Sequence, residues 1–217
     1  MTFGKAGLAL EFALLFVALP LAYRFLPFRF SPLPALWVIA AYCLWVLSRD
    51  PNFDWSKLWN ARMLGPSLRE ILVIWIVAAL VMTLVVWTRH PAWLFRLVRE
   101  HPFFWLLIMA LYPVLSVYPQ GIIYRAFLCH RYQGLFGGML ALMLVSAAAF
   151  SFSHIIFRSY WSVGLTLVAG LLFAWRYLVT GSLLASSFEH ALYGCYVFTV
   201  GLGSLFYHGA GRAATDR

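Results

Sequence analysis

The stretch PQGIIYRAFL, residues 119–128, places Gln120 and Arg125 within a sequence that is otherwise almost entirely apolar. A charged side chain at the centre of a bilayer costs about 2.5–3.5 kcal/mol on insertion scales, so such a residue is a candidate for function. Pro119 suits the first turn of a helix, because proline has no N–H to donate there. In that helix Gly121 and Arg125 are four residues apart and share a face. The stretch therefore predicts a membrane helix that carries a polar site.

The composition excludes a soluble domain. Hydrophobic residues make up 64% of the 217 residues, charged residues make up 11%, and the mean hydropathy is +0.85. Soluble domains carry roughly 25% charged residues, so this chain cannot build an aqueous surface. The net charge is +9, and the basic residues lie in short connections, where they anchor helix ends against anionic lipid head groups. We therefore predict an integral membrane protein in contact with the lipid bilayer, and we exclude nucleic acid as a partner.

Seven apolar runs approach the length of about 20 residues that a helix needs to cross the hydrocarbon layer. They cover residues 6–23, 32–47, 71–87, 103–117, 135–157, 161–178 and 182–200. We therefore expect an all-α polytopic bundle of about seven spans, folded as a single membrane domain. We divide it into N-terminal spans (1–117), a motif-bearing core (118–203) and a polar tail (204–217). Basic residues are shared equally between the two sets of loops, so the orientation stays open.

Two histidines join Arg125 as polar centres within apolar helices. His154 follows Phe150 by one helical turn, and His190 precedes Gly194 by one turn, so each pair shares a helix face. The cost of placing three polar centres in a membrane falls if they share one hydrated pocket. This pattern fits an intramembrane catalytic site or a transport pathway.

Three motifs, in order, resemble those of the CAAX-protease and bacteriocin-processing (CPBP, or Abi) family of intramembrane peptidases. The family motifs are E-E-x-x-x-R, F-x-x-x-H and a later His followed four residues on by Asn. The corresponding residues here are Gln120-Gly121-x-x-x-Arg125, Phe150-x-x-x-His154 and His190-x-x-x-Gly194. The resemblance covers roughly residues 118–203. It implies an all-helical bundle with a membrane-embedded cavity, and an endopeptidase activity on peptide or membrane-protein substrates, including prenylated CAAX tails.

The resemblance also implies roles for the motif residues. In the family, a glutamate of the first motif and the histidine of the second activate a water molecule, and the later His and Asn stabilise the oxyanion. His154 is then the base or its partner, and His190 is an oxyanion donor with Gly194 at the position of its Asn partner. The family leaves open whether a metal such as zinc takes part, and it implies no other cofactor.

The first motif departs from the family because Gln120 and Gly121 replace both glutamates. Glutamine cannot accept a proton at neutral pH, and glycine has no side chain. Losing a positioned general base typically lowers the rate by about 10²–10⁴-fold. Gly194 also lacks an oxyanion donor worth about 10²–10³-fold. We therefore expect impaired catalysis.

Two other glutamates are candidate substitutes for the missing carboxylates. Glu11 and Glu189 both lie in apolar runs, and either could supply a base. Arg125, which lacks the glutamate four residues before it, then pairs with one of them or receives the C-terminal carboxylate of a substrate.

Other functions remain open at this point. A non-catalytic relative would keep the cavity and bind peptides or partner proteins. A small transporter would line a pathway with the polar residues, and a structural membrane protein would use them for packing. We expect the chain in a bacterial inner (plasma) membrane, and the sequence leaves the substrate and oligomeric state open.

Overall fold

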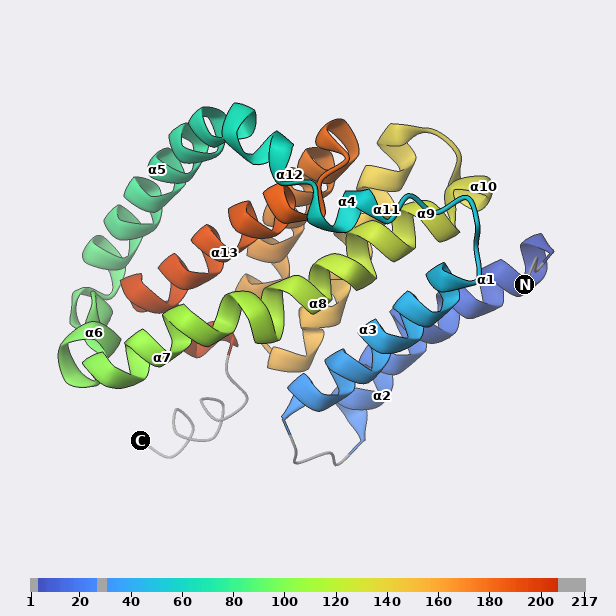
Figure 1. The fold of residues 1–217 in the computed structure, drawn as a ribbon. Helices are drawn as coiled ribbons and strands as arrows, with labels where there is room; N and C mark the ends of the chain where they lie inside the picture. The colour runs from blue at the N-terminus through green and yellow to red at the C-terminus, as the bar shows by residue number, and fades with distance from the viewer. Residues whose placement is uncertain (1–3, 27–30, 207–217) are drawn as a thin grey trace.

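The computed structural model describes residues 4–26 and 31–206, and this part of the chain is helical without a strand. The helices are α1 (Lys5–Ala13), α2 (Leu19–Phe25), α3 (Pro32–Ser48), α4 (Ser56–Trp59), α5 (Leu64–Arg89), α6 (Arg96–Glu100), α7 (Pro102–Tyr112), α8 (Tyr118–Gly121), α9 (Leu128–Arg131), α10 (Gln133–Phe136), α11 (Met139–Ser153), α12 (Tyr160–Thr180) and α13 (Leu183–Val200). Figure 1 shows them as one bundle in which α13 lies beside α7. Of the predicted tail, residues 207–217 lie outside the described residues, and Gly203–Phe206 form a 3₁₀ turn.

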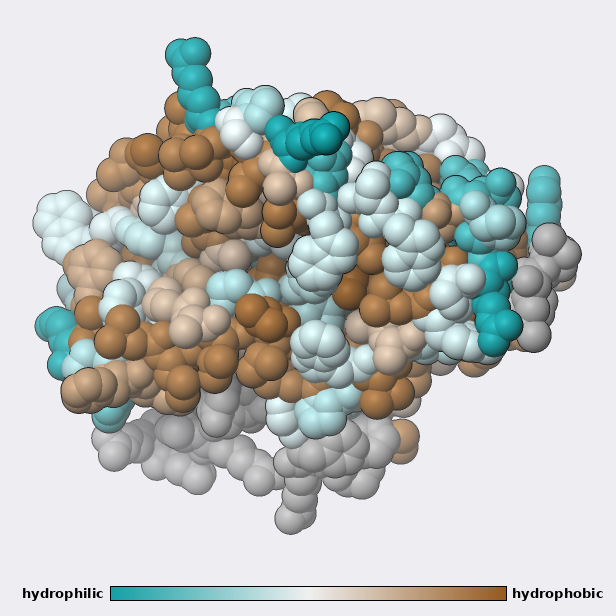
Figure 2. All heavy atoms as spheres, in the orientation of Figure 1, coloured by the Kyte–Doolittle hydropathy of each residue, from teal (hydrophilic) through white to brown (hydrophobic). Residues whose placement is uncertain are grey.

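Within residues 4–26 and 31–206, five helices are long and apolar enough to cross a membrane, which confirms the predicted polytopic all-α bundle. They are Lys5–Phe25, Ala61–Arg89, Pro102–Arg131, Met139–Phe157 and Tyr160–Thr180, and α3 is a shorter apolar helix. Large apolar side chains stay exposed on these helices, as the mainly hydrophobic face in Figure 2 shows. Lipid would cover this surface, because an exposed apolar area of this extent does not suit water.

The helix Pro102–Arg131 contains two π-helical stretches, Pro113–Val117 and Ile122–Phe127. The predicted helix start at Pro119 is wrong, because Pro119 lies inside this helix between the two stretches. A proline within a membrane helix is tolerated where local π geometry satisfies the freed backbone groups again. Such π stretches occur frequently at functional sites.

Buried ion pairs connect the helices around the bundle. Arg176 of α12 donates to Glu189 of α13 at 2.9 Å and to Glu70 of α5 at 2.7 Å. At the other end, Glu11 of α1 accepts hydrogen bonds from Arg131 at 3.0 Å and from the Tyr42 hydroxyl at 2.8 Å. Each buried carboxylate therefore has a cation beside it, which its removal from water requires.

We expect Arg176→Met to lower the free energy of unfolding by about 3–5 kcal/mol, because fully buried Glu189 then loses its cation. Glu70→Gln is the matched control. The Glu70 side chain is half exposed, so its loss should cost only about 0–1 kcal/mol. Denaturant unfolding in detergent micelles measures both, and equal losses in the two variants would contradict the expectation.

Candidate active site

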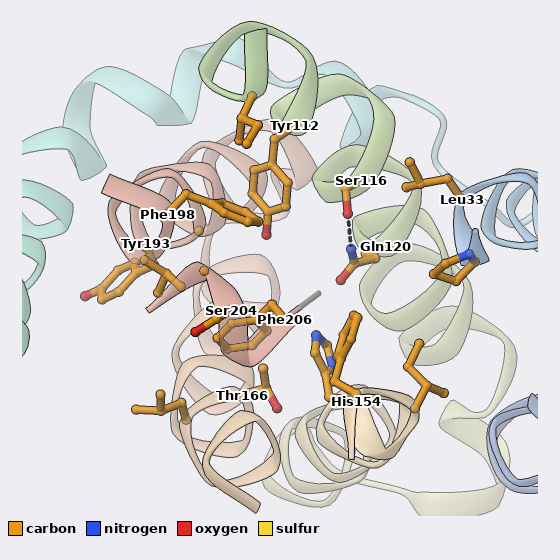
Figure 3. A pocket seen from close by; sticks show the side chains of 18 of the residues that line it. Leu33, Tyr112, Ser116, Gln120, His154, Thr166, Tyr193, Phe198, Ser204 and Phe206 are labelled. Atoms are coloured by element: carbon orange, nitrogen blue, oxygen red, sulfur yellow. Dashed lines mark hydrogen bonds between the residues drawn. The ribbon is translucent and has the colours of Figure 1, made fainter. Parts of the chain in front are cut away.

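A cleft of about 1600 Å³ runs into the bundle between α7, α11, α12 and α13. Five of the residues singled out by the sequence motifs line it: Gln120, Phe150, His154, His190 and Gly194. They come from separate parts of the bundle, with His190 and Gly194 both on α13, and Figure 3 shows the Gln120 and His154 side chains directed into the same cavity. The structure thus brings one residue of the first motif and both residues of the second and third motifs to one place.

The amide of Gln120 is held in one orientation. Its Nε2 donates a hydrogen bond to the Ser116 hydroxyl at 2.7 Å, one turn earlier on the same helix. The amide oxygen then faces the cleft (Figure 3). This oxygen can accept a hydrogen bond from a water molecule or a peptide N–H, but it cannot remove a proton.

His154 has the geometry of a general base. It lies at the end of α11, where its Nδ1 is 2.8 Å from the carbonyl oxygen of Phe150. A carbonyl only accepts hydrogen bonds, so Nδ1 carries the proton and Nε2 keeps a free lone pair. The ring points into the cleft (Figure 3). The F-x-x-x-H spacing therefore has a physical role, since one helical turn separates the carbonyl from the imidazole that it orients.

His190 is held by aromatic contacts. Its ring stacks on Phe173 with centroids 4.6 Å apart and an interplanar angle of 22°, and it meets the edge of Phe150 at 5.3 Å. The Phe150 ring also contacts His154 at 4.7 Å, so one phenyl ring lies against both imidazoles. Within the described part of the chain the His190 ring has no hydrogen-bond partner, which leaves its nitrogens for a ligand in the cleft.

Arg125 does not line the cleft. It is 1% exposed, and its guanidinium lies 4.2 Å from the Phe150 ring centroid and 5.4 Å from that of Phe173. Its Nη1 reaches the Gln120 carbonyl oxygen at 3.5 Å, while Nε and Nη2 have no hydrogen-bond partner among the described residues. Arg125 is thus a buried cation that lies over two cleft-lining rings, in the geometry of a cation–π interaction.

The predicted pairing of Arg125 with Glu11 or Glu189 is wrong. Glu11 binds Arg131 and Tyr42, Glu189 binds Arg176, and neither glutamate lines the cleft. The structure therefore does not bring either carboxylate together with the histidines.

One carboxylate, Glu100, lines the cleft within the described residues. Its side chain is half exposed on α6 and pairs with Arg96 at 2.8 Å. The hydrogen bond from Arg96 lowers the pKa of the Glu100 carboxyl below its ordinary value. Glu100 thus lies in an exposed ion pair with Arg96.

The donor set of the cleft does not form a complete metal site. In residues 4–26 and 31–206, no group of three or more His, Cys, Asp or Glu side chains could hold a metal ion. Catalytic zinc sites commonly use three such protein ligands. The imidazoles of His154 and His190 and the Gln120 amide oxygen fall short of that set, so we derive no catalytic step through a metal.

Gly121 faces α13 and does not line the cleft. A Cβ atom at this position would lie 2.9 Å from the Ser187 hydroxyl oxygen and 3.0 Å from Cδ1 of Leu183. A glutamate side chain therefore has no room here in the present packing. Because Gly121 has no side chain, α8 can pack closely against α13 at this motif position.

Sequence reasoning missed several polar residues of the cleft, among them Tyr112 and Ser116. Tyr112, Ser116 and Gln120 recur every four residues, a spacing that favours one face of a regular α-helix, and in the structure a π-helical stretch lies between Tyr112 and Gln120. That period was a usable signal, but it is weak, because tyrosine and serine are common in membrane helices.

Comparison with known protein families supports the motif assignment. Residues 100–196 match the family model of type II CAAX prenyl endopeptidases, Rce1-like. The matched segment contains all three motifs, so the resemblance to CAAX-processing peptidases is confirmed over these residues. Comparison with curated proteins and with solved structures gives no match.

We expect Gly121→Ala to lower the free energy of unfolding by about 1–3 kcal/mol, because the added methyl group overpacks the contact with α13. Gly164→Ala in α12 is the matched control. Nothing lies within 4 Å of a Cβ at that position, so alanine there should stabilise the helix by about 0.5–1 kcal/mol. Adding Ser187→Gly to Gly121→Ala should recover part of the loss. If Gly121→Ala is as stable as Gly164→Ala in detergent unfolding, the packing argument fails.

Proposed function

We propose that this chain, whose residues 100–196 are Rce1-like, is an intramembrane endopeptidase that hydrolyses peptide bonds within its cleft. The observation that carries the proposal is the His154 imidazole, which the Phe150 carbonyl orients so that Nε2 faces the cleft that the Gln120 amide oxygen also faces. Peptide hydrolysis needs a base for water and donors aimed at the developing oxyanion. We propose a bacterial inner membrane as its location.

His154 carries out the proton transfers in this mechanism. Its Nε2 takes a proton from a water molecule whose other hydrogen is bound by the Gln120 amide oxygen. The water oxygen attacks the carbonyl carbon of the peptide, and the C=O electron pair moves to the oxygen, where His190 donates a hydrogen bond. The proton then passes from His154 to the departing nitrogen as the C–N bond breaks. Because Gln120 and Gly121 replace the glutamates of the first motif, we expect turnover about 10²–10⁴-fold below that of a carboxylate-bearing site.

The walls of the cleft favour an apolar substrate segment. Leu107, Ile108 and Leu111 of α7 line it together with Phe150 and Phe173. Such walls suit a membrane-bound peptide tail that carries apolar side chains or a lipid modification. These groups leave lipid and enter an apolar cleft, so their surroundings stay apolar.

A second function, peptide binding without hydrolysis, is favoured by the packing at Gly121. Ser187 and Leu183 occupy the space that a motif glutamate would need. With this space filled, the cleft keeps its walls and its histidines but lacks the glutamate that would act as the base. In this case the chain would hold peptides or partner proteins.

We expect the full chain in liposomes to cleave an apolar, CAAX-type peptide, and His154→Gln to lower kcat by at least about 10²-fold. His90→Gln is the matched control, since His90 is exposed, stacks on Trp93 and does not line the cleft. Mass spectrometry of the fragments measures cleavage. Peptide binding without cleavage by the unaltered chain would favour the second function, and equal rates for all three proteins would contradict the role of His154.

A further inference from the structure

The space beside Gly194 is filled by a side chain from another helix. Gly194 lies on α13 one turn after His190, and a Cβ built there would overlap the ring and the hydroxyl oxygen of Tyr112. Tyr112 is the last residue of α7. The tyrosine thus occupies the place where any side chain at position 194 would lie.

The Tyr112 ring is fixed by its neighbours. It meets the Phe198 ring edge-on with centroids 5.4 Å apart at 71°, and it contacts the His190 ring at 6.4 Å and 88°. Both neighbours lie on α13, on either side of Gly194 along the chain. The absence of a side chain at position 194 is what allows the ring to lie this close to the helix.

The Tyr112 hydroxyl is free to bind a ligand. Figure 3 shows it directed into the cavity, toward the space between the Gln120 amide and the His154 ring. Tyr112 lines the cleft, and its hydroxyl has no hydrogen-bond partner within the described residues. A tyrosine hydroxyl commonly finds a partner when it is enclosed, so a free one at this place indicates a donor for a bound group.

We infer that the Tyr112 hydroxyl is an oxyanion donor of this site and supplies, from α7, the hydrogen bond that glycine at position 194 cannot supply from α13. This inference rests on the proposed endopeptidase function. When water attacks the peptide carbonyl, the C=O electron pair becomes the oxyanion, and the Tyr112 O–H and an N–H of His190 donate to it. Tyr112 keeps its proton throughout, since His154 carries the proton from the water to the departing nitrogen.

The first test separates catalysis from binding. In the full chain reconstituted in liposomes, Tyr112→Phe should lower kcat about 10²–10³-fold, the effect of one oxyanion donor, and leave KM close to its original value. The phenylalanine ring still fills the space beside Gly194, so the packing is kept. Tyr193→Phe is the matched control. The Tyr193 side chain also lines the cleft and its hydroxyl has no partner among the described residues, but the hydroxyl points away from Gln120 and His154 in Figure 3, so its loss should leave kcat unchanged.

The second test moves the donor back to α13. Gly194→Asn alone should abolish cleavage, because the new side chain overlaps Tyr112. Tyr112→Ala removes the ring, and adding Gly194→Asn to it should raise kcat above that of Tyr112→Ala alone. If Tyr112 only filled space, Tyr112→Phe would be as active as the unaltered chain and the asparagine would restore nothing.

A binding measurement tests Tyr112 even without turnover. A peptide phosphonamidate, which mimics the tetrahedral intermediate, should bind Tyr112→Phe about 10²-fold more weakly than it binds the unaltered chain, while the parent peptide binds both equally. If the unaltered chain does not cleave the peptide but still shows this difference in binding, the proposed endopeptidase activity is wrong. The Tyr112 hydroxyl would then still be a hydrogen-bond donor to a bound oxyanion. Equal cleavage and equal phosphonamidate binding by the unaltered chain and Tyr112→Phe would overturn the inference for Tyr112 alone.

Discussion

The lack of water in the hydrocarbon layer determines where every polar side chain of this protein can lie. An ionised group there needs a partner within the protein or a hydrated space. Arg176 and Arg131 meet this need with the buried glutamates Glu189 and Glu11, and these pairs connect α12 to α13 and α9 to α1. The histidines meet it by opening onto a cleft. Arg125 has no buried glutamate beside it and does not open onto the cleft. Its guanidinium instead lies over the Phe150 and Phe173 rings, whose faces attract a cation.

Phe150 connects the parts of the site. Its carbonyl orients His154, its ring contacts both imidazoles, and its ring also supports the Arg125 guanidinium. The three sequence motifs therefore meet at a single aromatic side chain rather than through direct polar contacts. This arrangement keeps the histidines in fixed orientations without using up the nitrogen atoms that face the cleft, which is what preorganised catalysis or ligand binding requires.

Hydropathy was sufficient to predict the bundle, because a membrane helix depends mainly on its own apolar length. Motif spacing also pointed to the residues that the structure places around the cleft at positions 120, 154, 190 and 194. The position of Arg125 could not be predicted, because 3.6-residue periodicity does not apply across a π-helical stretch. Tyr112 escaped detection for a different reason. Its importance comes from a glycine on another helix, and such a relation exists only in three dimensions.

The two π-helical stretches of the helix Pro102–Arg131 make the number of residues in this segment as important as their identity. Each stretch holds more residues per turn than an α-helix, and one residue corresponds to a rotation of about 100° about the helix axis. Tyr112 precedes the first stretch, Gln120 lies between the two, and Arg125 lies in the second. If residues 113–117 closed to regular α geometry with the same number of residues, Tyr112 would turn by about 100° relative to Gln120 and would leave the cleft. The angular alignment of three side chains thus depends on the backbone coil of these two stretches, a property that no substitution scan would reveal.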